Sequence, residues 1–278
     1  VKAPIAELSP ALVKNALKLR GAPTDDDGPH MLRRRLQHGL AGDHTAWLPQ
    51  LDLFSDRYRV VAMDNPGSGD STPVDAPCTT EELADTVLAL MDNMGIDKAH
   101  VVGRSLGGLI GQHMALRAPH RMQSLILAAS TPQVDPIGKR ILENMREVLE
   151  WRDNWEDWAR HSAHMFVAPG FYNDNPEAMA RIEALVGNEA RSKISYVNLN
   201  HTALTHNMSD RLGEIACPTL IMAGRVDPIC SMHGTDILSA GIPNSETVVF
   251  EKSSHFFLME EYEKSMTTLT DWFAKHTP

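Results

Sequence analysis

A serine flanked by glycines is the residue best placed to do chemistry. Ser105 lies in the segment Gly103-Arg104-Ser105-Leu106-Gly107, which fits the pattern G-x-S-x-G. β-branched residues precede this segment and an apolar stretch follows it, which indicates a strand, a sharp turn and a helix. Such a turn exposes the serine hydroxyl and points the Leu106 N–H to where an oxyanion would form. The segment therefore predicts a nucleophilic serine rather than an incidental one.

A serine hydroxyl is a weak nucleophile unless a base takes its proton, and a histidine base needs a carboxylate to orient it. Asp227 follows the buried-strand pattern that ends at Gly224, and His255 lies between the last strand and the last helix. Because the carboxyl ends of parallel strands meet at one edge of a sheet, these residues should converge on the serine. We predict a catalytic triad of Ser105, Asp227 and His255.

Other residues compete for these roles. Asp64 and Asp135 also follow strands, although Asp64 precedes the serine in the chain. His38 lies before a glycine and suits an anion-binding turn better than a base. An oxyanion hole needs two N–H donors. We expect Leu106 to supply one and Leu40 the other, with Gly39 as the alternative to Leu40.

Strand and helix patterns alternate at short intervals in most of the chain, which predicts an α/β fold with a doubly wound, mostly parallel sheet. The interval 132–213 holds helical patterns, no convincing strand and many aromatic residues. We interpret it as a helical cap inserted into a core formed by 30–131 and 214–278. Residues at the cap and beside the serine are candidate substrate contacts, namely Trp158, Phe166, His206 and Arg104.

Two parts of the N-terminal region resist a simple interpretation. Residues 1–29 form a segment of uncertain structure, with either a helix after Ser9-Pro10 or a short strand at Leu17–Arg20. The expected strand at 31–37 contains Arg33-Arg34-Arg35, which does not suit a strand buried on both faces. Either the guanidinium groups extend to the end of the sheet, or the strand lies near the sheet edge.

Composition excludes several classes of protein. The 278 residues carry a net charge of -10 with dispersed acidic side chains, which argues against nucleic acid as a partner. No apolar run approaches the roughly 18 residues of a membrane span, and the first residues lack a signal-peptide pattern. Three cysteines form neither a disulfide framework nor a metal motif. We expect a cytoplasmic protein with a small-molecule substrate and no metal or organic cofactor; assembly into a homo-oligomer is left open.

Together these motifs resemble the α/β-hydrolase superfamily. The matching features are His38-Gly39 after an early strand, the D-x-x-G-x-G-x-S loop at Asp64–Ser71, the elbow at Ser105, and the later Asp227 and His255. The resemblance covers roughly residues 30–277. Within the superfamily, the sequence most resembles small capped bacterial esterases, enol-lactonases and C–C bond hydrolases.

The resemblance implies a serine hydrolase that cleaves an ester or lactone of a small to medium apolar substrate through an acyl-enzyme on Ser105. A C–C bond hydrolase acting on a diketone-like substrate would use the same triad. A non-hydrolytic cyclase or ligand-binding protein is the third interpretation, because one fold can host unrelated functions.

Overall fold

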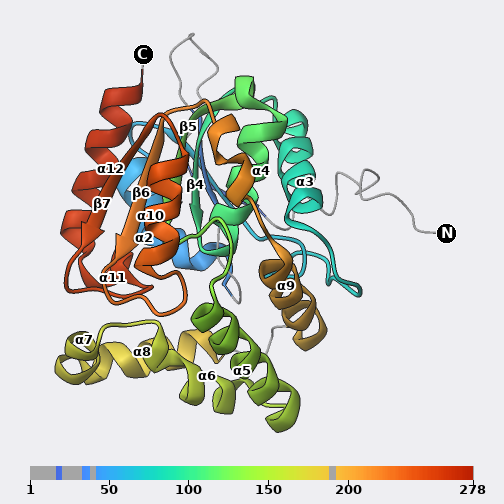
Figure 1. Cartoon of the computed structure of the whole chain (residues 1–278), viewed down its shortest axis with the longest axis vertical. Helices are drawn as coiled ribbons and strands as arrows, with labels where there is room; N and C mark the ends of the chain where they lie inside the picture. The colour runs from blue at the N-terminus through green and yellow to red at the C-terminus, as the bar shows by residue number, and fades with distance from the viewer. Residues whose placement is uncertain (1–16, 21–32, 38–41, 188–191, 278) are drawn as a thin grey trace.

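In the described part of the chain, a seven-stranded sheet forms the centre of the molecule (Figure 1). The computed structural model describes residues 17–20, 33–37, 42–187 and 192–277. The strand order is β1-β3-β2-β4-β5-β6-β7, and every neighbouring pair is parallel except β1 with β3. The strands are β1 (Leu17–Arg20), β2 (Arg33–Gln37), β3 (Arg59–Met63), β4 (Ala99–Arg104), β5 (Met122–Ala128), β6 (Thr219–Gly224) and β7 (Ser245–Phe250). The predicted fold class, a mostly parallel α/β sheet, is confirmed.

Helices cover both faces of this sheet. One face packs against α3 (Thr80–Asn93), α4 (Leu106–Arg117) and α10 (Met232–Gly241). The opposite face packs against α2 (Leu48–Phe54), α11 (Phe257–Glu260) and α12 (Tyr262–His276). Short 3₁₀ helices connect these elements: η2 (His44–Trp47), η3 (Pro119–Arg121), η4 (Ala163–Met165) and η5 (Ser209–Glu214).

The continuous apolar run of β5 shows why helices are needed on both sides. Leu125 and Leu127 belong to the core beneath α3 and α4, whereas Ile126 and Ala128 belong to the core beneath α12. Successive side chains of a strand point to opposite faces, so a run without polar interruption must be buried twice. This double burial holds the strand ends, and the loops that follow them, at one rim of the sheet.

Between β5 and β6 the chain forms a layer of helices below that rim (Figure 1). They are α5 (Pro136–Arg152), α6 (Trp155–Ser162), α7 (Pro169–Asp174), α8 (Pro176–Val186) and α9 (Lys193–Thr205). Inside the layer Trp155, Trp158 and Tyr196 meet edge to face, with ring centroids 5.4 to 5.5 Å apart. The limits 132–213 for a cap domain stay a prediction.

The N-terminal expectations have mixed outcomes. Leu17–Arg20 is a strand, as one of the two interpretations held, and it runs antiparallel to β3. The suggestion that the arginine-rich strand lies near the sheet edge is wrong, because β2 pairs with both β3 and β4. Residues 1–16 and 21–32 lie outside the described residues.

At the other edge, β7 is partly exposed and is covered by charged side chains. Lys264 of α12 donates from Nζ to the Val249 carbonyl at 3.0 Å and lies 4.6 Å from the Phe250 ring centroid.

Among the described helices, none is both long enough and apolar enough to cross a lipid bilayer.

His206 lies at the hinge where the inserted helices rejoin the core, not in the pocket where it was expected to contact substrate. The outgoing and returning chains meet here, through a bridge between Gln133 and Asn207. His206 is buried, and its Nδ1 lies 2.9 Å from Thr80 Oγ1. The centroid of its ring lies 5.3 Å from that of the His113 ring. Packing between α3, α4 and the hinge turns the imidazole away from the cavity. The expectation for His206 is therefore corrected.

The hinge should make stability depend on pH. Burial, with a smaller effect of His113, lowers the pKa of His206 to about 3. In the unfolded chain His206 takes up a proton as pH falls below about 6.5, whereas in the folded protein it stays neutral. The folded state therefore loses stability as pH falls below 6.5. Between pH 6.5 and 5 we expect a loss on the order of 1.5 kcal/mol from this residue.

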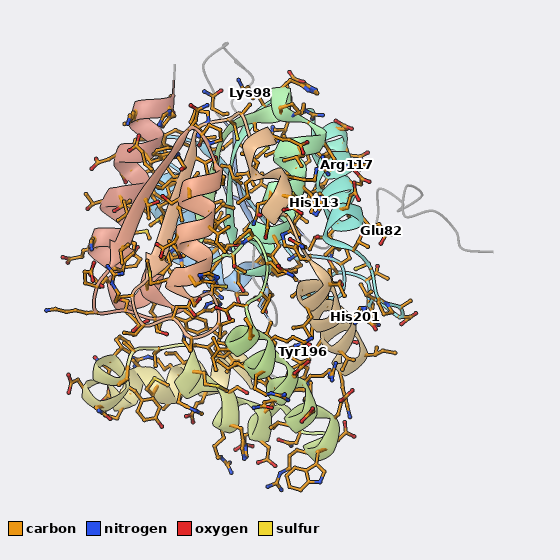
Figure 2. The ribbon with its side chains drawn as sticks, in the orientation of Figure 1. Glu82, Lys98, His113, Arg117, Tyr196 and His201 are labelled. Atoms are coloured by element: carbon orange, nitrogen blue, oxygen red, sulfur yellow. The ribbon has the colours of Figure 1, made fainter. Side chains whose placement is uncertain are left out.

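Chemical denaturation across that pH range measures the effect. H206N should flatten the pH dependence of the unfolding free energy. H201N is the matched control, because His201 is exposed on α9 (Figure 2) and its substitution should leave the slope unchanged. Equal slopes for wild type and H206N would contradict the assignment.

Candidate active site

Ser105 occupies a strained turn between β4 and α4. Its backbone has φ 53° and ψ -119°, a conformation that residues with a side chain rarely adopt. The turn is held by the Ser105 N–H, which donates to the Ala128 carbonyl at 2.9 Å. It also needs a residue without a side chain at 103, since a Cβ on Gly103 would lie 2.3 Å from the Gly107 carbonyl oxygen. The strand and helix can thus meet closely enough to lift the serine above the sheet rim.

Asp227 and His255 form a buried hydrogen-bonded pair. His255 Nδ1 lies 2.8 Å from Asp227 Oδ2. The other carboxylate oxygen of Asp227 accepts the N–H groups of Ile229 at 2.8 Å and Cys230 at 3.0 Å. Asp227 therefore shapes its own turn and orients the imidazole at the same time. Fixing Nδ1 in this way leaves Nε2 as the nitrogen able to exchange a proton.

A close approach of two loops brings this pair together. Gly224 ends β6, and a Cβ there would lie 2.2 Å from the Ser254 carbonyl oxygen. Next to it the Val226 N–H donates to the Ser253 carbonyl at 3.2 Å. The loop after β7 is thereby pinned against the loop after β6, which sets His255 beside Asp227.

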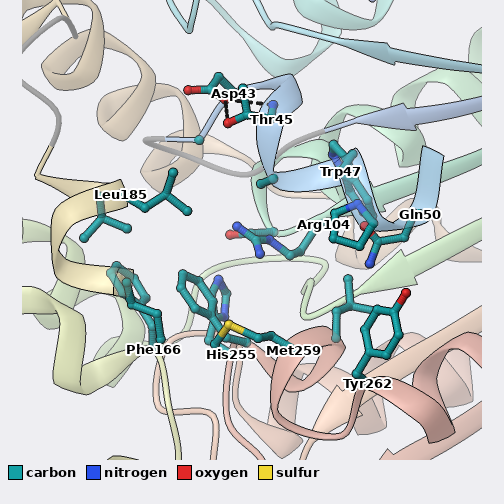
Figure 3. Close-up of a pocket in the computed structure, with 18 of the residues that line it drawn as sticks. Asp43, Thr45, Trp47, Gln50, Arg104, Phe166, Leu185, His255, Met259 and Tyr262 are labelled. Carbon is teal, nitrogen blue, oxygen red and sulfur yellow. Dashed lines mark hydrogen bonds between the residues drawn. The ribbon is translucent and has the colours of Figure 1, made fainter. Parts of the chain in front are cut away.

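Ser105 and His255 open into one cavity of about 270 Å³ between the sheet rim and the inserted helices (Figure 3). Most of its wall is apolar or aromatic. The lining side chains include Trp47, Trp158, Phe166, Ile182, Leu185, Val186, Phe256, Leu258, Met259 and Tyr262, with Asp43, Thr45, Gln50 and Arg104 as polar members. A cavity with an apolar wall and a few polar groups beside a nucleophile is typical of a small-molecule site.

The sequence-predicted site residues divide into four groups. Trp158, Phe166 and Arg104 line the cavity with Ser105 and His255, whereas His206 lies at the hinge. Leu106 is the first residue of α4, so its N–H is one of those left without an acceptor inside the helix. Leu40 and Gly39, the expected second donors, lie outside the described residues, as does His38.

The two competing acids have other tasks. Asp64 is buried and accepts the His44 N–H at 2.6 Å and the Asp70 N–H at 3.0 Å, while its Oδ2 lies 3.0 Å from His44 Nδ1. Asp135 caps α5 by accepting the Gly138 N–H at 2.8 Å and also bonds the Ser231 hydroxyl. Both stabilise loops at the rim, and neither takes the place of Asp227 beside His255.

Sequence reasoning missed Cys230. Its buried thiol lies beside Asp227 and His255, with the Ser105 hydroxyl as a hydrogen-bond partner. Burial, together with the charges of Asp227 and Asp135, raises the pKa of this thiol well above its usual value. The thiol therefore keeps its proton. The residue follows a turn, Asp227-Pro228-Ile229, and no motif in the chain marks it.

Two clusters have the residue types of metal ligands, Asp227–Cys230–His255 and Asp43–His44–Asp64. In both, the carboxylate oxygens already accept hydrogen bonds from backbone N–H groups and from imidazole. The geometry of the described residues thus fits hydrogen-bonded loops.

Comparison with known proteins places this geometry in a family. The model of the alpha/beta hydrolase fold matches residues 36–262, which is most of the chain. The chain belongs to the α/β-hydrolase fold family. It is thus an enzyme of the hydrolase type, built on the fold that the motifs at Ser105, Asp227 and His255 had indicated.

Individual relatives of this α/β hydrolase are distant. A protein of Agrobacterium fabrum named "Putative carbamate hydrolase RutD" is 28% identical over 84% of this chain and 88% of its own length. The 3-oxoadipate enol-lactonase 2 of Acinetobacter baylyi is 28% identical over 81% of this chain and 82% of its own. The crystal structure of MGS-M2, an α/β hydrolase from a deep-sea metagenome library, has a TM-score of 0.85 at 19% identity and covers 93% of each chain.

In this hydrolase the inserted helices are tied directly to the histidine loop. The Phe256 N–H donates to the Phe166 carbonyl at 2.8 Å, and the two rings stack with centroids 4.9 Å apart. The Glu260 carboxylate accepts the Ala168 N–H at 2.7 Å and the Ser254 N–H at 2.9 Å. Phe166 also lies 6.1 Å from the His255 ring. The cavity roof and the imidazole are therefore positioned by a shared set of contacts.

Removing the Glu260 carboxylate should loosen both sides of this tie. In E260A the amide hydrogens of Ala168 and Ser254 lose their acceptor, so we expect each to exchange about tenfold faster with solvent. Hydrogen–deuterium exchange by mass spectrometry measures this. E263A is the control, because Glu263 is exposed on α12. Unchanged exchange in E260A would mean that other contacts hold the two loops together.

Proposed function

We propose that this enzyme hydrolyses a carboxylic ester or lactone of a small to medium substrate through an acyl-enzyme on Ser105. The observation that carries the proposal is the shared cavity: a serine in a strained turn and a histidine oriented by a buried carboxylate both line the same cavity. These are the parts that nucleophilic acyl transfer needs.

The reaction proceeds in two stages. Ser105 Oγ attacks the substrate carbonyl while His255 Nε2 takes the hydroxyl proton, and the C–O bond to the leaving alcohol breaks as His255 returns that proton. Water then attacks the acyl-enzyme with His255 again as base, which releases the acid and restores the serine. Asp227 holds Nδ1 and stabilises the imidazolium in each stage. All the atoms that transfer protons belong to the protein, the substrate or water, so we expect no metal or organic cofactor to take part.

The oxyanion that forms in both stages requires N–H donors. The Leu106 N–H stands at the first position of α4, where the helix dipole adds a favourable field. Leu40 remains our candidate for the second donor. The Leu106 N–H does not need to reorganise, because the close contact between Gly103 and the Gly107 backbone holds this turn.

The relatives' names support ester-like chemistry without selecting one substrate. One relative is named an enol-lactonase and another a carbamate hydrolase, and both names describe cleavage at a carbonyl carbon that bears a heteroatom. A C–C bond hydrolase would use the same three residues. A panel of p-nitrophenyl esters, lactones and vinylogous diketones separates the two, and turnover of the diketones alone would favour C–C cleavage.

We also propose that the enzyme acts in the cytoplasm.

A fluorophosphonate probe tests the nucleophile. The wild-type protein should become covalently labelled at Ser105, because the probe reacts with activated serines. S105A should not be labelled and should lose ester hydrolysis, while S130A, which changes a serine two positions after β5 that donates to the Ser105 carbonyl at 3.2 Å, should still be labelled. Equal labelling of wild type and S105A would refute the proposed nucleophile.

Changing the orienting carboxylate to an amide tests the triad as a unit. In D227N the hydrogen bond to Nδ1 favours the wrong imidazole tautomer, so we expect kcat to fall by about 10³- to 10⁴-fold. The competing acids provide the control: D135N should lower kcat by less than about tenfold, since Asp135 caps α5. Steady-state kinetics with one p-nitrophenyl ester measures both. A larger loss in D135N than in D227N would assign the acid to Asp135.

A further inference from the structure

Gln50 places a side-chain amide in the wall of the cavity that Ser105 and His255 line. The residue is 4% exposed and extends from α2 toward the cavity (Figure 3). Its side-chain oxygen Oε1 is buried and has no hydrogen-bond partner in the part of the chain that the structure describes. Buried polar groups are normally paired, because an unpaired one costs stability. The amide therefore indicates a partner that is not part of the chain.

Packing of α2 does not require an amide at this position. The helix buries Leu51 and Phe54 beneath the sheet, together with Trp47 directly before it. Successive helical residues point about 100° apart, so Gln50 faces the cavity while Leu51 faces the core. An apolar side chain of similar size would fill the same space without an unpaired oxygen. The cavity, rather than the helix, accounts for the amide.

Other polar residues of the cavity wall already have protein or solvent contacts. Asp43 accepts the Thr45 N–H at 2.8 Å and also bonds the Thr45 hydroxyl. The Arg104 guanidinium carbon lies 4.7 Å from the centroid of the Phe256 ring. Tyr262 is 40% exposed and stays in contact with water. These contacts distinguish them from the glutamine amide, whose pairing depends on what enters the cavity.

We propose that Gln50 recognises a primary carboxamide group of the substrate, a few bonds from the ester or lactone carbonyl that Ser105 attacks. A glutamine amide offers N–H donors and an acceptor oxygen, and its terminal torsion is broad, so the edge that carries both can turn toward a ligand. A carboxamide presents the complementary edge and forms one N–H···O bond in each direction. This inference rests on the proposed function, because it specifies the substrate class of the same site.

The chemistry of the pair excludes the nearest alternatives of the same size. A carboxylate has no donor for Oε1 and would place a negative charge beside that oxygen. A methyl ketone can accept one hydrogen bond and leaves Oε1 unpaired, and an alkyl chain pairs with neither amide atom. A site with a buried polar group discriminates strongly against a ligand that leaves the group unpaired.

Matched methyl esters test the inference. Methyl succinamate carries the carboxamide, methyl 4-oxopentanoate has a methyl group in place of its NH₂, and methyl pentanoate also lacks its carbonyl. For each protein kcat/KM for the carboxamide is divided by that for the pentanoate, so the fraction of active protein cancels. Wild type should prefer the carboxamide, with the ketone between the two. Q50L should lower the ratio by about 10- to 100-fold, mainly through KM, because two hydrogen bonds are lost.

A second pair of esters covers the alcohol side of the bond. 3-Carbamoylpropyl butanoate and pentyl butanoate place the same groups on the leaving alcohol. Q133L is the control, because Gln133 is exposed and does not belong to the described cavity lining, so its ratios should match those of wild type. Equal ratios in wild type and Q50L for both pairs would overturn the inference. If Q50L does not fold, Q50M carries the same comparison.

Stability and binding separate recognition from a structural role. Without ligand, Q50L should unfold at the same temperature as wild type or a higher one, since it removes an unpaired buried oxygen. A lower unfolding temperature, with equal loss of activity on all esters, would assign Gln50 a structural role instead. Calorimetric binding of methyl succinamate to S105A should weaken at least tenfold when Q50L is added. If S105A still hydrolyses esters, the proposed function fails, while the ratios of wild type and Q50L still decide the inference.

Discussion

The hydrogen bond between His255 and Asp227 is the interaction on which the site depends, and it is made possible by the sheet. Asp227 follows β6 and His255 follows β7, two parallel neighbours whose ends lie at the same rim. Packing of both sheet faces fixes those ends, and the side-chain-free surface at Gly224 lets the two loops touch. His255 and Asp227 lie 28 residues apart in the chain, and this packing brings Nδ1 and Oδ2 to 2.8 Å from each other. The remaining parts of the site are arranged around that pair.

Positions governed by local pattern could be predicted from the sequence. Ser105, Asp227 and His255 each follow a strand that its apolar residues predict. Because the carboxyl ends of parallel strands meet at one edge of a sheet, the three residues could be predicted to converge. The structure brings Asp227 and His255 into contact and opens Ser105 onto the same cavity.

Features produced by tertiary packing could not be predicted in the same way. Cys230 beside the serine and Phe256 beneath Arg104 occupy ordinary positions in the sequence, and their roles follow from which loops meet. His206 was misplaced because a cap histidine with helical neighbours gives no sign of which way it turns; packing against Thr80 and His113 decided it. The place of β2 in the sheet was left between two alternatives, since strand order is a property of the whole sheet.

The lysine that covers the last strand has a consequence for association between copies. Lys264 occupies a carbonyl of β7 that an incoming strand would otherwise use, and Lys275 of the same helix forms an ion pair with Glu246 on that strand. Any association that continued the sheet from one molecule into the next through β7 would have to displace these lysines and expose part of the core beneath α12. Growth of the sheet into fibres is thus opposed at this border.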